Sequence, residues 1–259
     1  MKVYIHTDLE GVSGIETFEM IQTNSPRFEE SRLKLTSDVN AAVAGAFDGG
    51  AVEVTVLDSH GSGIDNIVWE KVDPRAQRDT KPTGKWWGIL DESYDATFFI
   101  GAHAMAGTLD GFLDHTQSST SIYNWYYNGR KFGELGQWAM VAGNFGVPLV
   151  MVAGDEAAVA EAKAFFSPIE TAPVKRGVGR NRAECLEPDE AHRRIHDAAA
   201  RALSLVGKAA AFEVDMPLEI VIDFCRSDFC DRAAGGEGVE QIDARRVRKI
   251  AQNRLDIFV

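Results

Sequence analysis

A strand–helix–strand pattern in the first sixty residues constrains the fold more than any other feature. An apolar, alternating segment at residues 2–7 stops at a glycine-rich turn, and a β-branched run at residues 52–58 stops in the same way. Between them, apolar residues recur at helical spacing from Ser25-Pro26, a typical helix start, to Gly49-Gly50, a typical helix stop. Two strands joined through a helix pair in parallel, so the sequence predicts a parallel sheet with helices on its faces.

Further strands and helices continue this pattern. Apolar runs at residues 96–104 and 147–155 predict two more strands, and Asn128-Gly129 between aromatic-rich flanks predicts a hairpin. The segments that begin at Glu134 and Glu156 are typical of helices. We therefore expect an α/β fold with a mostly parallel central sheet and flanking helices.

The last third of the chain is less regular, and we interpret it as a smaller α+β domain. Pro168 to Pro173 is a candidate linker, which would divide the chain into a larger α/β domain at residues 1–168, carrying the chemistry, and a smaller domain at residues 169–259. Within the second part the sequence predicts a helix at 188–211, strands at 218–224 and 238–242, and a helix from Ala244.

The charge balance argues against some classes of partner. The 259 residues include 39 acidic and 27 basic side chains, a formal net charge of −12, which disfavours nucleic acid or an anionic membrane as the main partner. The first residues lack the apolar stretch of a signal peptide, and no later segment is long enough to span a bilayer, so we expect a cytoplasmic protein. The three cysteines are expected to be free thiols.

Three of the predicted strands end in acids or histidines. The first runs into Asp8 and Glu10, the second into Asp58 and His60, and the third into His103. In a parallel sheet these carboxyl ends lie side by side, and ligands bind in the crevice just outside them. Unpaired carboxylates are costly to bury at such a place. A bound cation removes this cost, and mixed histidine and carboxylate ligands suit zinc.

Glu134 is a further candidate, because it lies between two glycines at the start of a predicted helix. Its charge either stabilises the helix N-terminus or adds one more carboxylate to the crevice. One catalytic zinc usually takes about three protein ligands and a water. If Asp8 bridges two ions, the candidate ligands suffice for both, which fits a two-metal hydrolytic site. These candidate ligands are Asp8, Glu10, His60, His103 and Glu134.

The remaining histidines and Asp58 have simpler interpretations. His115, in a loop after the third strand, either folds over the site as a base, acid or nucleophile or is an ordinary loop residue. His6 lies within the first strand and is expected to point away from the crevice or into the core. His192 and His196 are expected on a solvated helix face, and Asp58 is expected to cap a turn or to orient a ligand histidine.

Four short motifs occur here in the order found in a known family. They are "DLEGVSG" near the N-terminus, "DSHGS" after the second strand, "GAHA" after the third and "GELG" before a helix. In this order they resemble the D-aminopeptidase family of dinuclear zinc peptidases. The similarity covers about the first 185 residues, including "VPLVMVAGD" and "APVKRGVGR", whereas the final third matches the family poorly in residue detail.

The resemblance implies roles for the candidate ligands. Asp8 would bridge two zinc ions. Glu10 and His60 would complete one of the two sites, and His103 and Glu134 would complete the other. The resemblance also implies ring-shaped homo-oligomers, namely decamers of two stacked pentamers whose active sites face an inner chamber.

The resemblance further implies an activity. His115 falls where the family has its proposed catalytic nucleophile, and the family removes an N-terminal residue, often a D-amino acid, from short peptides. We therefore expect a zinc aminopeptidase with two zinc ions per chain. Two other classes stay open: another dinuclear hydrolase, such as an amidase or a phosphatase, and a non-catalytic metal-binding protein. No arginine cluster is aimed at the predicted site, which disfavours a phosphate substrate.

Overall fold

The first sixty residues form the centre of a parallel sheet, as the sequence predicts. β1 (Lys2–Thr7) pairs in parallel with β2 (Glu53–Asp58) on one side and with β4 (Ala96–Ala102) on the other. The computed structural model describes residues 1–82 and 84–259, and in these ranges the sheet has seven strands. Their spatial order is β3 (Gln77–Arg78), β2, β1, β4, β7 (Leu149–Asp155), β8 (Glu170–Gly179) and β9 (Arg182–Cys185).

The direction of winding changes at β1. The chain runs from β1 outward to β2 and later returns to place β4 on the other side of β1. All neighbouring strands of this sheet are parallel except β8 and β9, so the predicted mostly parallel α/β fold is confirmed. In such sheets, ligands bind at the switch point, outside the carboxyl ends of the strands.

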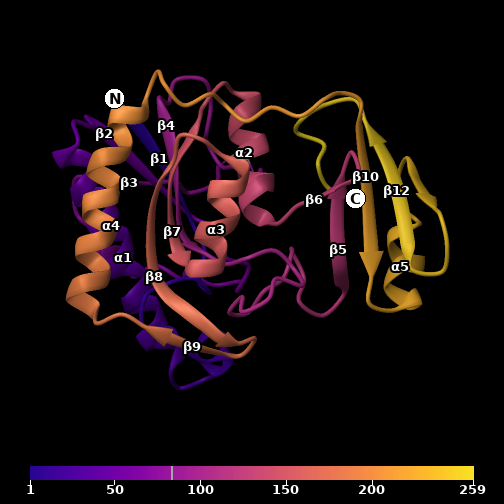
Figure 1. Cartoon of the computed structure of the whole chain (residues 1–259), viewed down its shortest axis with the longest axis horizontal. Coiled ribbons are helices and arrows are strands. Elements are labelled where there is room, and N and C mark those ends of the chain that lie inside the picture. The colour runs from indigo at the N-terminus through magenta and orange to yellow at the C-terminus, as the bar shows by residue number, and fades with distance from the viewer. Residues whose placement is uncertain (83) are drawn as a thin grey trace.

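Helices cover both faces of this sheet (Figure 1). α1 (Phe28–Asp48) and α4 (Pro188–Ala202) lie on one face, and α2 (Glu134–Asn144) and α3 (Glu156–Phe165) lie on the other. Separate clusters of buried apolar side chains fill the two interfaces. Short 3-10 helices occur in the connections, namely η1 (Phe18–Ile21), η2 (Trp69–Lys71) and η3 (Leu203–Leu205).

A second, antiparallel sheet lies on the far side of α2 (Figure 1). Met140 and Val141 of α2 pack into its core, whereas Leu135 and Trp138 of the same helix pack on the first sheet. Helix α2 is therefore buried between the two sheets. The strand order is β11 (Val239–Gln241), β12 (Arg246–Ala251), β10 (Leu218–Phe224), β5 (Ile122–Tyr127) and β6 (Arg130–Lys131), and α5 (Ser227–Ala233) follows β10. The predicted hairpin at Asn128-Gly129 joins β5 to β6.

Details of the C-terminal third differ from the prediction. The residues after Ala244 form β12 instead of a helix, because they pair with β10 and bury Val247 and Ala251 in the core of the second sheet. Pro173 lies in β8 and not in a linker, and the register of the β7–β8 pairing shifts beside it, where an N–H is missing. Helix α4 ends at Ala202, and Gly207, with φ of 78°, then redirects the chain.

Sheet membership does not follow the expected division between residues 168 and 169. β8, β9 and α4 belong to the layers of the first sheet, although they come after this point in the chain. β5 and β6 belong to the second sheet, although they come before it. That the C-terminal part is a separate domain stays a prediction.

The loop after β1 packs directly on the backbone of β4. The N–H of Asp8 donates to the carbonyl oxygen of Ile100 at 2.8 Å, and the N–H of Gly11 donates to that of Gly101 at 2.9 Å. Gly101 has φ of 82°, and a Cβ there would collide with the carbonyl oxygen of Asp8, so only glycine fits. This close approach holds Asp8 and Glu10 beside the end of β4.

Lys175 on β8 fixes the same loop from another side. Its ammonium group, on a residue only 3% exposed, donates to the carbonyl oxygens of Glu10 and Ile15, both at 2.6 Å. It also lies over the ring of Phe112, 4.7 Å from the centroid. A buried ammonium requires such partners because its transfer out of water is otherwise costly. Lys175 therefore holds the backbone of the segment that carries two of the candidate ligands.

Within residues 1–82 and 84–259, none of the helices combines the length and the apolar character that a membrane-spanning segment needs. Cys185, Cys225 and Cys230 are free thiols, as expected.

We expect Lys175→Met to lower the free energy of unfolding by about 2–4 kcal/mol, because the carbonyl groups of Glu10 and Ile15 lose their donor inside the protein. Urea unfolding followed by circular dichroism measures this change. Arg176→Ala is the matched control: its side chain is 62% exposed and pairs with exposed Glu184, so no measurable change is expected. Equal stability of Lys175→Met and the wild type would contradict the anchoring role of Lys175.

Candidate metal centre

The six residues singled out in the sequence lie together at the switch point of the first sheet. Asp8 and Glu10 follow β1, and His60 follows β2. His103 follows β4, and Glu134 is the first residue of α2. His115 comes from the loop between β4 and β5. Because β1 lies between β2 and β4, the strand ends that carry these side chains are neighbours.

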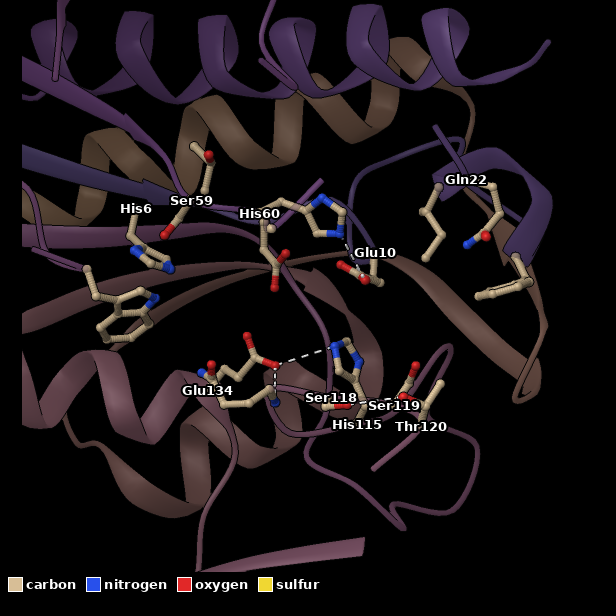
Figure 2. Close-up of a pocket in the computed structure, with 17 residues that line it drawn as sticks. His6, Glu10, Gln22, Ser59, His60, His115, Ser118, Ser119, Thr120 and Glu134 are labelled. Carbon is tan, nitrogen blue, oxygen red and sulfur yellow. Dashed lines mark hydrogen bonds and ion pairs between the residues drawn. The ribbon is translucent and has the colours of Figure 1, made fainter. Parts of the chain in front are cut away.

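Each imidazole approaches a carboxylate through its Nε2 atom. Nε2 of His60 lies 3.4 Å from Oε1 of Glu10, and Nε2 of His103 lies 3.3 Å from Oδ2 of Asp8. Oε1 of Glu134 lies 3.5 Å from Nε2 of His103 and 3.4 Å from Nε2 of His115, as seen in part in Figure 2. These contacts join His60 to Glu10 and join Asp8, Glu134 and His115 through His103, and the mutual approach of Asp8, Glu10 and His103 brings the two groups into one cluster.

Two overlapping sets of side chains in this cluster have the geometry to hold a metal ion. One consists of Asp8, Glu10 and His103, and the other of His103, Glu134 and His115; in each, the ligand atoms all lie within 4.8 Å of one another. His103 belongs to both sets. The rings of His103 and His115 are stacked, with centroids 4.1 Å apart.

Hydrogen bonds on the far side of each ring orient the three imidazoles. Nδ1 of His103 lies 3.0 Å from the carbonyl oxygen of Ala104, and Nδ1 of His115 lies 2.9 Å from that of Leu113. A carbonyl can only accept, so Nδ1 carries the proton and the neutral ring turns the lone pair of Nε2 toward the carboxylates. This arrangement is typical of histidines that bind a metal.

His60 is oriented in the same way by Asn66. Oδ1 of Asn66 lies 3.3 Å from Nδ1 of His60, and Nδ2 of Asn66 donates to Oδ1 of Asp58 at 2.8 Å. Asp58 also accepts the backbone N–H groups of Asn66 and Ile67, at 2.6 and 3.1 Å. Asp58 therefore caps the turn after β2 and orients His60 through Asn66, which agrees with its expected supporting role.

Burial makes the charges of this cluster depend on one another. Burial and the neighbouring Glu10 carboxylate raise the pKa of Asp8 to about 7. Burial also works against the charged form of His60, but the Glu10 carboxylate outweighs it and raises the pKa of His60 to about 10. Burial and the charge of His103 lower the pKa of His115. Without a bound cation, the imidazole of His60 and the carboxyl group of Asp8 would therefore tend to take up protons, which reduces the negative charge of the cluster.

The residues of the cluster fit a divalent cation. Oε2 of Glu10 and Nε2 of His103 are buried and have no hydrogen-bond partner among residues 1–82 and 84–259. Buried polar atoms without partners are rare and require an explanation. A cation between the carboxylates and the Nε2 lone pairs would satisfy both kinds of atom at once, and the mixture of nitrogen and oxygen donors suits zinc.

His6 is buried against Phe99 and Trp138, which agrees with the second of its two expected positions, and it also lines the same cavity as the acids. Because successive side chains of a strand alternate, His6 and Asp8 lie on the same side of β1. His6 is only 3% exposed, and it does not point away from the acids. The period of two could have revealed this from the sequence.

Two further residues that support the site were not found in the sequence. Asn66 orients His60, and Lys175 holds the backbone at Glu10. Lys175 is 165 positions away from Glu10 in the chain, so no local signal connects the two. An asparagine six residues after a candidate ligand is a weak signal that could have been noted.

His192 and His196 lie on α4 and belong to separate contacts. Nε2 of His192 lies 3.4 Å from Oδ1 of Asp38, and Nε2 of His196 lies 2.9 Å from Oδ2 of Asp48. Neither belongs to a set of side chains with metal-binding geometry among the described residues. Their side chains are 33% and 35% exposed, which agrees with the expected solvated helix face.

A cavity of about 560 Å³ opens above the cluster (Figure 2). Glu10, His60, His115 and Glu134 point into it from different segments. Among the described residues that line it there is no lysine and no arginine. The cavity therefore offers carboxylates, imidazoles and hydroxyl groups to a bound molecule.

Comparison with known proteins agrees with these features. The profile of the peptidase M55 family, described as D-aminopeptidase, matches residues 1–259. The D-aminopeptidase of Bacillus subtilis (strain 168) is 37% identical over 206 residues, which cover 78% of this chain and 74% of that protein.

A solved structure is similar over almost the whole chain. It is the Zn-dependent D-aminopeptidase DppA from Bacillus subtilis, described as a self-compartmentalizing protease. The two structures superpose with a TM-score of 0.93 at 31% sequence identity, over 99% of this chain and 94% of that one. The chain therefore belongs to the D-aminopeptidase family of M55 peptidases.

Proposed function

We propose that this protein is a zinc-dependent D-aminopeptidase that removes the N-terminal residue from short peptides at a pair of zinc ions. The main observation behind this proposal is the cluster at the floor of the cavity, where three carboxylates lie close to the Nε2 atoms of three imidazoles. Membership of the D-aminopeptidase family supports the activity. The zinc dependence of the similar solved structure supports the choice of metal.

The proposed division of the ligands has Asp8 as the bridge between two ions. Glu10 and His60 complete one site, and His103 and Glu134 complete the other. The short distances from Asp8 to His103 and from Glu10 to His60 support this division. A pair of zinc ions supplies positive charge that polarises the scissile carbonyl group and lowers the pKa of water at the site.

His115 is the proposed catalytic residue. The carbonyl of Leu113 keeps the proton on its Nδ1 atom, so the lone pair of Nε2 is directed toward Glu134 at the floor of the cavity. There it either attacks the carbonyl carbon of the substrate, so that the peptide amine leaves and water later releases the acyl group from the ring, or it takes a proton from the attacking water and passes it to the leaving amine. His115 also belongs to one of the sets with metal-binding geometry, so the test of its role must measure metal as well as rate.

The lining of the cavity favours an amide over a phosphoester as the substrate. Enzymes that bind phosphate groups commonly use arginine, and the described lining residues include neither arginine nor lysine. A dinuclear phosphatase would thus lack its usual anion-binding groups here.

Zinc content tests the proposed ligands. We expect about two zinc ions per wild-type chain, and His103→Ala to lose at least one of them, because His103 faces both Asp8 and Glu134. Inductively coupled plasma mass spectrometry of freshly purified protein measures this. His196→Ala is the matched control, since this histidine lies on the surface of α4 and pairs with Asp48 at the end of α1. A wild type without bound metal would refute the proposed site.

Turnover tests the role of His115. We expect His115→Ala to keep its zinc and to lose about 10²–10⁴-fold in kcat on D-alanyl dipeptides, as is usual when a residue that transfers protons is removed. Zinc content and rate are measured on the same preparation, again with His196→Ala as control. Near-normal kcat would remove His115 from the mechanism, and a loss of zinc would make it a ligand.

We further propose that the chain forms a closed homo-oligomer, a decamer of two stacked pentamers. The description of the similar solved structure as self-compartmentalizing supports this assembly. Light scattering coupled to size exclusion is expected to give about ten times the 28.3 kDa of one chain. A monomer at micromolar concentration would contradict the proposal.

A further inference from the structure

The cavity above the candidate metal centre has two unlike ends. Figure 2 shows His6 and Ser59 on one side of it and Gln22, Ser119 and Thr120 on the other, with the acids and imidazoles of the cluster between them. His6 is 3% exposed, whereas Ser119 and Thr120 lie at the protein surface. The cavity is therefore closed beside His6 and open beside Thr120.

Aromatic rings form the wall of the closed end. The imidazole of His6 is stacked on Trp138, with ring centroids 4.2 Å apart, and lies 4.5 Å from Phe99. The ring of Trp86 meets His6 edge to face at 5.4 Å and also lines the cavity. Trp86 is half-buried and lies in a loop, whereas the other rings belong to strands of the first sheet or to α2.

The closed end also contains polar atoms that lack partners. Oγ of Ser59 and Nδ1 of His6 are buried, and neither has a hydrogen-bond partner in the part of the chain that the structure describes. Both residues line the cavity. The Ser59 hydroxyl can rotate about its Cα–Cβ bond toward a molecule that enters the closed end, which would satisfy it.

An aminopeptidase must distinguish the two sides of the bond that it cleaves. On one side of the scissile bond there is a single residue, which carries the carbonyl group, and on the other side the peptide continues. With the carbonyl at the candidate metal centre, a closed end admits one residue and excludes a longer chain, while the open end leaves room for the rest of the peptide. The shape of this cavity matches that requirement.

We propose that the closed end binds the N-terminal residue of the peptide and that Trp86 limits the size of the side chain accepted there. This inference rests on the proposed aminopeptidase activity. Ser59 contacts the polar part of the bound residue, and Trp86 contacts its side chain. Trp86 is thus a specificity-determining residue, and its contact with substrate is an apolar one of the kind that discriminates side chains by size.

The C-terminal tail holds Trp86 in place. The ring of Phe258 meets Trp86 edge to face at 5.4 Å, and Phe258 in turn packs on Trp125 of β5 at 6.0 Å. The second sheet and the tail therefore support the wall of the pocket for the N-terminal residue. This gives the C-terminal third of the chain a direct structural connection to substrate selection.

Paired substrates test the assignment on the zinc-loaded enzyme. For Trp86→Ala we expect the ratio of kcat/KM for D-Phe-Gly over D-Ala-Gly to rise by at least about tenfold, because the wall that limits the first side chain is removed. The ratio for D-Ala-Phe over D-Ala-Gly, which differ in the second residue, is expected to stay unchanged. Trp87→Ala is the matched control: Trp87 is a half-buried neighbour that packs on Phe145 and does not line the cavity.

Binding of the free amino acids gives a second measurement that needs no turnover. Calorimetry is expected to show the ratio of the Kd for D-phenylalanine to that for D-alanine falling by a similar factor in Trp86→Ala. Trp86→Phe, which keeps the apolar contacts with Phe258, serves in place of Trp86→Ala if the latter does not fold, with a smaller shift in the same direction.

The outcomes separate the pocket from the activity. An active Trp86→Ala enzyme with both ratios unchanged, or with a shift for the second residue only, overturns the pocket assignment and leaves the proposed function standing. A wild type that releases no amino acid from any of these peptides contradicts the proposed function, while a shift in the two Kd values still supports the pocket. Absence of amino-acid binding to the wild type at millimolar concentration also overturns the assignment.

Discussion

The carboxylates of Asp8, Glu10 and Glu134 lie close together in a part of the protein that water reaches poorly. Like charges repel one another strongly in such surroundings, and a buried carboxylate needs a partner of opposite charge. The imidazoles of His103 and His115 present their Nε2 lone pairs to these carboxylates, because their Nδ1 atoms donate hydrogen bonds to backbone carbonyl oxygens. Lone pairs and carboxylates attract each other only through a positive charge placed between them. A divalent cation at this place would supply that charge and would take both kinds of group as ligands.

The rest of the fold keeps this arrangement in place. Gly101 allows the loop after β1 to approach the backbone of β4, and Lys175 fixes the same loop through its carbonyl groups. Asn66 orients His60 from the turn after β2. Helix α2, held between the two sheets, presents Glu134 from its first turn. Apart from the contact between Asn66 and His60, which is local, these contacts join segments that are distant in sequence, and together they hold the side chains in position before any ion binds.

Local patterns in the sequence were sufficient to predict the four adjacent strands β2, β1, β4 and β7 of the first sheet and most of the cluster. The alternation in β1 and β2 and the helical spacing between them predict a parallel pair, and parallel neighbours share an edge, which brings Asp8, His60 and His103 together. The C-terminal third was harder to predict, because β12 is defined by its pairing with β10 and not by its own composition. His6 is buried, as one of its two expected positions required, and its place in the wall of the cavity depends on tertiary contacts. The roles of Lys175 and Trp86 depend on tertiary contacts alone.

We propose that paired divalent cations hold the acids and imidazoles at the switch point. Anomalous diffraction from crystals of the purified protein, collected on both sides of the zinc absorption edge, tests it most directly. We expect two peaks about 3.5–4 Å apart, with Asp8 between them and with Glu10, His60, His103 and Glu134 around them. The proposal would be contradicted if crystals grown with zinc show no anomalous peak in the cluster and the carboxylates and imidazoles bind each other directly.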